Sequence, residues 1–378
     1  MTETVGLYVH VPFCTAKCHY CDFNSYAGLD RLFESYVEMV CREIETLSEG
    51  LGARTVFFGG GTPSLLAPEA LGRILSSIDR HLLLDPQTEI TVEANPGTVA
   101  ESRLSELRAL GINRISFGVQ SFDAGLLADL GRIHTTDQAA SARRAARAAG
   151  FESVNLDFIY GLPNQTLDTW RETLERALDL RPEHLSLYAL TVEPGTVFFR
   201  RAERGQLPLP DEDLVADMYE LAVDLLAGAG YEQYEISNWA LGATHRCQHN
   251  LGYWHNLDYV GVGPGAHSWF RGERHVNTLS PVQWAAQVER GEAPVCQREQ
   301  IPPGLALGET MMLGLRLVDG IDLDAVSARF GVDVRQRYAG PIDETRALAL
   351  TELCGSRLRL TKRARLLGNE VFRRFLMG

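Results

Sequence analysis

The sequence predicts an α/β fold: a partial or closed (β/α) barrel followed by a small, mainly helical C-terminal domain. In the first two-thirds of the chain, short stretches rich in Val, Ile, Phe and Tyr alternate about six times with amphipathic stretches. Such alternation is typical of parallel strands joined by crossover helices. The length of 378 residues and the 45% hydrophobic content suit a large buried core. An open, doubly wound sheet is the alternative architecture.

Six stretches have the composition of strands. They are Leu7–Val11, Thr55–Phe58, Glu89–Glu93, Arg114–Val119, Val154–Ile159 and Leu185–Leu190. In β/α barrels, chemistry gathers at the C-terminal ends of the strands. Glycines 59–61, Glu93, Gln120 and Asp157 stand at or near those ends, and we expect them to line one site.

Helices are expected between these strands and again near the C-terminus. Apolar residues recur at three- and four-residue spacing in Asp30–Leu47, Pro68–Leu82, Ala100–Leu110, Thr136–Ala149, Leu167–Leu180 and Asp211–Gly230. Beyond a proline-containing loop at 301–304, further helices are expected at Leu305–Leu317, Leu323–Phe330 and Val334–Tyr338, with a short strand and a closing helix in the tail. We therefore predict a barrel over residues 1–240, a connecting segment over 241–300 and a helical, winged-helix-like domain over 301–378.

Composition excludes several classes of protein. The 36 basic and 49 acidic residues give a net charge of −13, which disfavours general binding of nucleic acid. No apolar run approaches the ~18–20 residues of a membrane-spanning helix, and the first residues lack the pattern of a signal peptide. We therefore expect a cytoplasmic protein. Its seven cysteines, an odd number, favour metal binding or catalysis over disulfides.

Three cysteines form the strongest motif. Cys14, Cys18 and Cys21 follow a predicted strand at C-x3-C-x2-C spacing. Three thiolates can hold a four-iron cluster with one iron left open for another ligand, whereas an electron carrier normally supplies four. Zinc, with a fourth ligand from His10, His19 or Asp22, and unliganded thiols are the alternatives from spacing alone. The isolated cysteines 41, 296 and 354 are interpreted as small hydrophobic residues that are buried or partly exposed.

A second motif supports the first. Gly59-Gly60-Gly61-Thr62-Pro63 follows a strand, and its glycines allow the backbone to approach a ligand closely. Alone, this pattern is also that of a tight strand–helix turn. It lacks the spacing of a dinucleotide-binding fingerprint and the lysine of a P-loop.

Together these motifs resemble those of the radical S-adenosylmethionine (SAM) superfamily. Four longer strings resemble the oxygen-independent coproporphyrinogen III oxidase family and its relatives, the HemW-type heme chaperones. The strings are YVHVPFC (8–14), EANP (93–96), GVQSF (118–122) and DFIYGLP (157–163). The resemblance extends from about Gly6 to about His267, and more loosely through the C-terminal part.

The resemblance implies roles for individual residues. Cys14, Cys18 and Cys21 would hold a [4Fe–4S] cluster whose open iron binds SAM. Further contacts to SAM would come from Tyr8, Tyr20, Gly60, Gly61, Thr62, Glu93, Gln120, Arg132 and Asp157. Carboxylates suit the cationic groups and hydroxyls of SAM, and an arginine suits its carboxylate. The family also implies an electron donor such as flavodoxin or ferredoxin. Without the resemblance, these polar residues would be read as caps or ion pairs.

Two features separate the chaperone from the oxidase. The decarboxylating enzymes carry a further cysteine two residues after the third cluster cysteine, where this chain has Phe23, and a longer N-terminal segment. Residues 249–254 match the H-N-x-x-Y-W motif associated with heme binding in the chaperones, which makes His249, Asn250, Tyr253 and Trp254 heme candidates. A buried aromatic cluster, or zinc among His245, Cys247, His249 and His255, are the alternatives from the residues alone.

The resemblance therefore implies a heme chaperone that carries a [4Fe–4S] cluster and SAM and passes heme to an acceptor, a respiratory heme protein. It also suggests a homodimer. On this reading the radical SAM scaffold lacks coproporphyrinogen oxidase activity. The alternative is an oxygen-independent coproporphyrinogen III dehydrogenase, an enzyme that uses a SAM-derived radical in porphyrin biosynthesis. The sequence identifies no catalytic residue.

Overall fold

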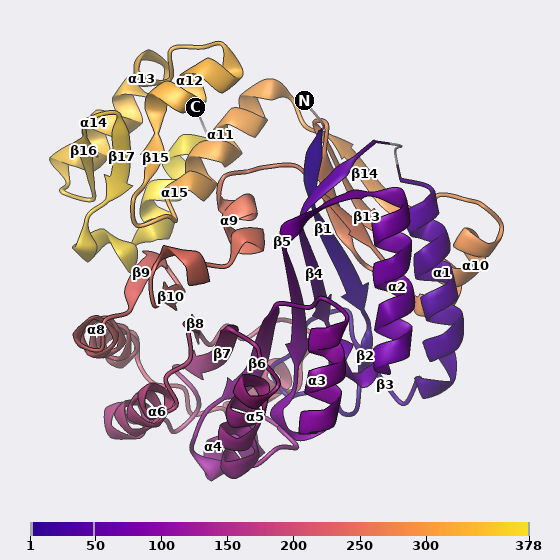
Figure 1. The fold of residues 1–378 in the computed structure, drawn as a ribbon. Helices are drawn as coiled ribbons and strands as arrows, with labels where there is room; N and C mark the ends of the chain where they lie inside the picture. Colours follow the sequence, from indigo (N-terminus) through magenta and orange to yellow (C-terminus); the bar gives the residue numbers. More distant parts are fainter. Residues whose placement is uncertain (1–2, 48–49, 377–378) are drawn as a thin grey trace.

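The computed structural model describes residues 3–47 and 50–376, and one large sheet organises most of them (Figure 1). The sheet has twelve strands in the order β14-β13-β12-β11-β1-β4-β5-β6-β7-β8-β10-β9. Its parallel strands are β1 (Thr4–Val11), β4 (Gly52–Gly60), β5 (Leu83–Ala94), β6 (Arg114–Gln120), β7 (Ser153–Tyr160), β8 (His184–Ala189) and β11 (Tyr259–Val262). The six predicted strands are confirmed.

Antiparallel strands extend the sheet at both edges. They are β9 (Glu232–Glu235) and β10 (Asn238–Ala240) on one side, and β12 (His267–Phe270), β13 (Glu273–Asn277) and β14 (Val295–Gln300) on the other. Within the described residues β9 and β14 are the edges, so the sheet stays open. The partial barrel is confirmed and the closed one is wrong, because β11 occupies the side of β1 where a closing strand would pair.

Helices cover the outer side of the curved sheet (Figure 1). In this part the structure has α1 (Phe33–Glu45), α2 (Pro68–His81), α3 (Glu101–Ala109), α4 (Ala124–Asp129), α5 (Thr136–Ala148), α6 (Leu167–Asp179), α7 (Val197–Glu203) and α8 (Glu212–Gly228). Thr135 and Thr166 begin α5 and α6 with capping boxes. The short helices α4 and α7 were not predicted, since each spans too few residues to show a periodic pattern.

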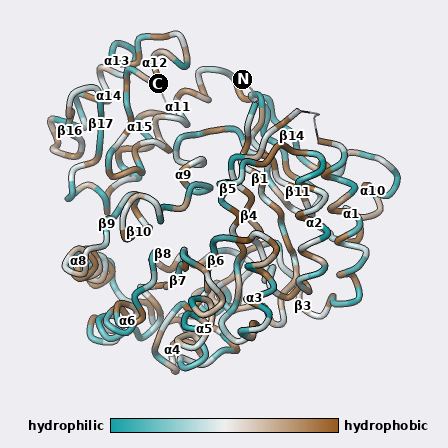
Figure 2. The backbone as a smooth tube through the Cα atoms, in the orientation of Figure 1, coloured by the Kyte–Doolittle hydropathy of each residue, from teal (hydrophilic) through white to brown (hydrophobic). Residues whose placement is uncertain are grey.

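The two faces of the parallel sheet differ in chemistry. Residues of one set, including Val9, Phe58 and Phe117, are buried in the core beneath the outer helices. Intervening positions carry polar side chains such as Glu93 and Asp157, which line a cavity. Figure 2 shows hydrophobic stretches along the central strands and alternating hydropathy along the helices. The two-residue period of the strands thus places apolar groups outward and polar groups inward.

The C-terminal part has its own apolar core. It contains α11 (Pro303–Gly314), α12 (Leu323–Phe330), α13 (Val334–Arg337), α14 (Ala339–Ala347) and α15 (Gly368–Leu376), with a small sheet of β15 (Ile321–Asp322), β17 (Arg357–Leu360) and β16 (Thr351–Cys354). Met311, Tyr338 and Phe375 are among its buried residues. The mainly helical C-terminal domain is confirmed; α14 was not predicted. Residues 377–378 of the predicted tail lie outside the described residues.

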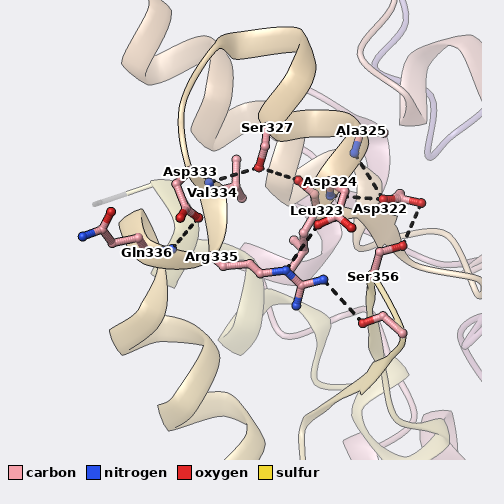
Figure 3. Close-up of polar contacts among 11 residues, drawn as sticks. Asp322, Leu323, Asp324, Ala325, Ser327, Asp333, Val334, Arg335, Gln336 and Ser356 are labelled. Atoms are coloured by element: carbon pink, nitrogen blue, oxygen red, sulfur yellow. Dashed lines mark hydrogen bonds and ion pairs between the residues drawn. The ribbon is translucent and has the colours of Figure 1, made fainter.

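Capping bonds shape this C-terminal part (Figure 3). The Asp322 carboxylate accepts bonds from the backbone N–H groups of Asp324 and Ala325 at 3.1 and 3.2 Å, and begins α12. Asp333 caps α13 in the same way, through the N–H of Gln336 at 3.0 Å. The division into segments 1–240, 241–300 and 301–378 stays a prediction.

Two further helices follow the main barrel in the chain. They are α9 (Gln248–Trp254) and α10 (Pro281–Glu289). Figure 1 shows α9 between the sheet and the C-terminal part, whereas α10 lies beside α1. Among the described residues, no helix is long and apolar enough to cross a membrane.

Candidate functional site

The three predicted cluster cysteines lie in a loop after β1. Cys14 belongs to β2 (Phe13–Cys14), which pairs with β3 (Tyr26–Ala27), and all three cysteines are partly buried. The backbone N–H of His19 donates to Leu130 O at 3.0 Å, and this bond holds the loop against the end of α4. Burial raises the pKa values of the Cys14 and Cys21 thiols. In the part of the chain that the structure describes, no three His, Cys, Asp or Glu side chains are arranged around one metal ion.

Donors nevertheless face two of these sulfurs. The Thr62 hydroxyl donates to Cys14 Sγ at 3.8 Å, and Arg132 Nη1 donates to Cys18 Sγ at 3.5 Å. Hydrogen bonds and positive charge near the sulfurs are levers that proteins use to tune iron–sulfur clusters. The loop therefore has the chemistry of a cluster site. His10 is less suited as a further ligand, because its ring nitrogens are bonded to the Tyr8 hydroxyl and to Asn24 O.

The glycine loop leaves no space for side chains. A Cβ at Gly61 would lie 2.4 Å from Phe13 O, and Gly60 has a φ of 111° with His10 Cε1 2.6 Å from the position of its Cβ. Glycine alone fits both positions without strain. The Gly60 N–H donates to Glu93 Oε2 at 3.1 Å, so the loop is tied directly to the next strand.

Arg132 connects three elements at the strand ends. Besides Cys18, it donates to Asn95 Oδ1 and to Gly118 O. Asn95 in turn donates to Thr62 Oγ1 at 2.9 Å. Asn95 lies in the EANP motif (93–96), but the sequence alone does not mark it as a site residue. Predicted residues Thr62 and Arg132 thus belong to one bonded network next to the cysteines.

The other predicted SAM residues divide between a cavity and the strand ends. Tyr8, Glu93 and Asp157 line a cavity of about 160 Å³ on the polar face of the sheet. Gln120 ends β6 in a left-handed conformation, with φ of 69°, and is buried. Tyr20 instead packs against an apolar cluster that contains Leu130. Tyr20 and Gln120 are not among the residues that line the cavity.

The cavity carboxyls are strongly affected by burial. Burial, followed by the nearby charge of Asp157, raises the pKa of Glu93 to about 8. Burial also raises the pKa of Asp157, although Ser116 and Asn155 donate to its two oxygens at 2.7 and 2.8 Å. A cationic ligand would relieve the cost of ionising these groups. The cavity therefore suits a ligand that carries positive charge and hydroxyls.

Sequence reasoning missed a chain of polar residues behind this cavity. His184 Nδ1 lies 2.6 Å from Asn155 Oδ1, and His184 Nε2 lies 2.8 Å from the Tyr234 hydroxyl. Cys247 N donates to that hydroxyl at 3.3 Å. The signal was available, because buried polar residues at alternate positions of β6, β7 and β8 indicate a lined interior.

The predicted heme residues do not lie together. His249 and Asn250 line the same cavity as Glu93, whereas Trp254 faces a separate cavity and Tyr253 borders both. His249 is 3% exposed, and its ring stacks on Phe57 with centroids 5.0 Å apart. Candidate residues for SAM and for heme thus meet on one face of the sheet.

His249 has partners at both ring nitrogens. Nδ1 lies 2.7 Å from Thr55 Oγ1, and Nε2 lies 2.8 Å from the Tyr253 hydroxyl. Burial, followed by the charges of Arg54 and Arg114, lowers its pKa to about 3, so the imidazole is neutral at physiological pH. A neutral imidazole can bind iron, but here one of these bonds would first have to break.

The remaining cysteines differ in burial. Cys247 is fully buried, and burial raises the pKa of its thiol to about 12. Cys41 is partly buried, whereas Cys296 and Cys354 are exposed. The interpretation as buried or partly exposed residues thus describes Cys41 better than the other two, which lie in β14 and β16.

Comparison with known proteins places the chain in a family. It is 37% identical to the heme chaperone HemW of Lactococcus lactis over 98% of this chain and 97% of the relative. It is 39% identical to HemW of Mycobacterium tuberculosis over 99% of this chain and 95% of the relative. The chain belongs to the HemW heme chaperone family.

Domain matches and a solved structure describe the scaffold of the chain. Residues 8–177 match the radical SAM superfamily, and residues 305–367 match the HemN C-terminal domain. Coproporphyrinogen III oxidase (HemN) from Escherichia coli has the same fold, with a TM-score of 0.86 over 99% of this chain and 90% of that chain, at 23% identity. At that identity, the likeness supports the fold alone. The HemW relatives carry the family assignment.

Proposed function

We propose that this chain binds heme and passes it to an acceptor heme protein of the respiratory chain. The observation that carries the proposal is the H-N-x-x-Y-W segment on α9, in a chain alignable with HemW relatives over almost its whole length. Glu89 accepts bonds from the N–H groups of Gln248 and His249, both at 3.1 Å, and so fixes α9 against β5. The segment is thus held in place on the polar face of the sheet.

The scaffold would also carry a [4Fe–4S] cluster and SAM. Cys14, Cys18 and Cys21 would hold the cluster, because donors already face two of their sulfurs. When bound, such a cluster supplies an electron to SAM and an open iron to chelate it. Glu93 and Asp157 would contact the cationic groups and hydroxyls of SAM from the cavity.

Further members of the SAM set would act at the strand ends. Arg132 would face the SAM carboxylate, and Gly60 and Gly61 would let the backbone approach it. Tyr8, Tyr20, Thr62 and Gln120 complete the proposed set. An electron donor of the flavodoxin or ferredoxin type, a homodimer and a cytoplasmic location stay predictions.

The alternative function is an oxygen-independent coproporphyrinogen III dehydrogenase. Its support is the shared fold with the E. coli oxidase. Against it, the position where the oxidases carry a further cysteine holds Phe23, which is 62% exposed and offers no sulfur. We therefore propose a scaffold without oxidase activity.

One assay separates the two functions. The protein is reconstituted with iron and sulfide without oxygen, then incubated with coproporphyrinogen III, SAM and a reductant. We expect no protoporphyrinogen IX above a cluster-free control, because the chaperone does not decarboxylate porphyrinogens. Sustained turnover would contradict the chaperone proposal and support the dehydrogenase.

A further inference from the structure

Asn95 bonds both side chains whose donors face the cluster cysteines. It directly follows β5, and its side chain is half-buried. Its Nδ2 donates to Thr62 Oγ1 at 2.9 Å, and its Oδ1 accepts from Arg132 Nη2. Thr62 donates to Cys14 Sγ, and Arg132 Nη1 donates to Cys18 Sγ. The two sulfurs are thus linked through a single amide.

The direction of each bond follows from the chemistry of its partners. A guanidinium only donates, so the oxygen of the Asn95 amide faces Arg132 and its NH₂ group faces Thr62. A threonine hydroxyl has a single proton. Because Thr62 accepts from Asn95, that proton is free to point at Cys14. A carboxylate or an apolar side chain at position 95 would lose one or both of these bonds.

Asn95 also helps to fix the plane of the Arg132 guanidinium. Nη2 donates to both Asn95 Oδ1 and Gly118 O, which uses both of its N–H groups. Because the guanidinium is planar, this anchoring sets the direction in which Nη1 reaches Cys18 Sγ, 3.5 Å away. Nη1 carries a second N–H, so Arg132 can still face the SAM carboxylate as proposed above.

We propose that Asn95 is a positioning residue that sets the reduction potential of the cluster through Thr62 and Arg132. The inference rests on the proposed function, because it takes Cys14 and Cys18 as cluster ligands. Reduction adds one negative charge to such a cluster, and hydrogen bonds and positive charge at the sulfurs stabilise that charge. The donors that Asn95 holds in place therefore make reduction easier.

A purely structural role for Asn95 predicts a different result, and Asn113 offers the matched comparison. Asn113 Nδ2 donates to Thr88 O at 2.8 Å, and its Oδ1 accepts from Ile90 N at 2.8 Å. Asn113 directly precedes β6, whereas Asn95 directly follows β5, and the two strands are parallel neighbours. Each amide thus makes two kinds of bond, but at opposite ends of the sheet, and Asn113 is remote from the cysteines.

A redox titration of the reconstituted full chain, followed by EPR without SAM, tests the proposal. We expect Asn95→Leu to make reduction about tenfold less favourable, a shift of ~59 mV to a more negative midpoint potential for one electron. The EPR g-values should change as well, because donors at two sulfurs move. Thr62→Val removes one donor and leaves Asn95 in place, so its shift should be smaller. Asn113→Leu should keep the wild-type potential.

The opposing outcomes are distinct. A wild-type potential and EPR spectrum in fully loaded Asn95→Leu would overturn the proposal, and so would an equal shift in Asn113→Leu. If Asn95→Leu takes up no iron, Asn95→Ala and Thr62→Val carry the test, and the wild-type potential in both would overturn the proposal. A wild-type protein that takes up no iron would instead contradict the proposed cluster itself.

Discussion

The polar face of the sheet differs in its lining from the cavity of about 500 Å³ beside α11, whose walls include Trp254 and Trp269. On the polar face, Asp157, Asn155 and His184 are bonded to one another in a continuous chain. Beside α11, the indole N–H groups of Trp254 and Trp269 are buried and have no hydrogen-bond partner among the described residues. The polar face is lined mainly by charged and hydrogen-bonding side chains, whereas the cavity beside α11 is lined mainly by aromatic and apolar ones. The comparison teaches that buried carboxyls able to contact a cationic ligand, such as Asp157, belong to the polar face.

The largest expected effect is loss of the proposed iron–sulfur cluster, which would leave the cavity beside α11 unchanged. Cys18→Ser removes the sulfur that accepts the Arg132 hydrogen bond. We therefore expect the reconstituted variant to lack iron–sulfur absorbance. The measurement is iron content and the visible spectrum after anaerobic reconstitution. Cys41→Ser serves as the control, because Cys41 lies on α1 away from the loop. A Cys18→Ser protein with full iron content would assign the ligands elsewhere.

A pH effect should arise where the barrel meets the 241–300 segment. Glu43 is buried and accepts bonds from the Gly263 N–H at 2.8 Å and the Trp284 indole at 3.1 Å, and burial raises its pKa to about 7. Between about pH 4.5 and 7, the folded state therefore binds more protons than the unfolded state. The free energy of unfolding should fall as pH rises through this window, by up to about 3 kcal/mol from this group.

Denaturant unfolding at several pH values measures this effect. Glu43→Gln should flatten the pH dependence, since the amide does not titrate. Glu45→Gln is the control, because Glu45 lies on the same helix and is exposed. If Glu43→Gln and the wild type show the same slope, Glu43 is not the titrating group.

A smaller effect should test whether Glu93 contacts SAM in the cavity on the polar face. Glu93→Gln removes a carboxylate that faces the proposed SAM site, and we expect the affinity for SAM to fall about tenfold, or ~1.4 kcal/mol. Equilibrium dialysis of SAM against the reconstituted protein provides the measurement. An unchanged affinity for SAM would contradict the placement of Glu93 at the SAM site.

The smallest effect concerns the contact between α11 and the turn that follows α9. Asn256 Nδ2 donates to Thr310 Oγ1 at 2.9 Å, and both residues are buried. Thr310→Val leaves this amide with only the Ala306 carbonyl oxygen, at 3.5 Å, among the described residues, so we expect a loss of about 1 kcal/mol in unfolding free energy. Thermal unfolding measures this loss, with iron content after reconstitution as the control for the cluster loop. An unchanged free energy of unfolding would show that this bond does not stabilise the fold.

Sequence reasoning found the polar region better than the aromatic one. Parallel strands with a two-residue period, and three cysteines within eight residues, are local signals, and both can be read directly. Trp269 and Met312 carry no such signal, because pairing of β12 with β11 and packing of α11 bring them together from distant segments. The strands β12–β14 were missed for a related reason, since they only extend a sheet that begins elsewhere in the chain.

The same limit applies to the H-N-x-x-Y-W segment. Its motif identified a set of candidate heme residues, but neither the helix α9 nor the fact that His249 and Trp254 face different cavities. On a helix, residues five apart point in clearly different directions. Only the packing of α9 between the two regions shows which member lies on which side.

Transfer of heme to an acceptor protein is the most direct test of the proposed chaperone function. Protein loaded with one equivalent of heme is mixed with the apo form of a respiratory heme protein, the two are separated, and the Soret absorbance of each fraction is measured. We predict that heme moves to the acceptor unaltered and restores the acceptor's spectrum faster than the same amount of free heme does. Heme that stays on this chain, or reaches the acceptor only at the rate of free heme, would contradict the chaperone function.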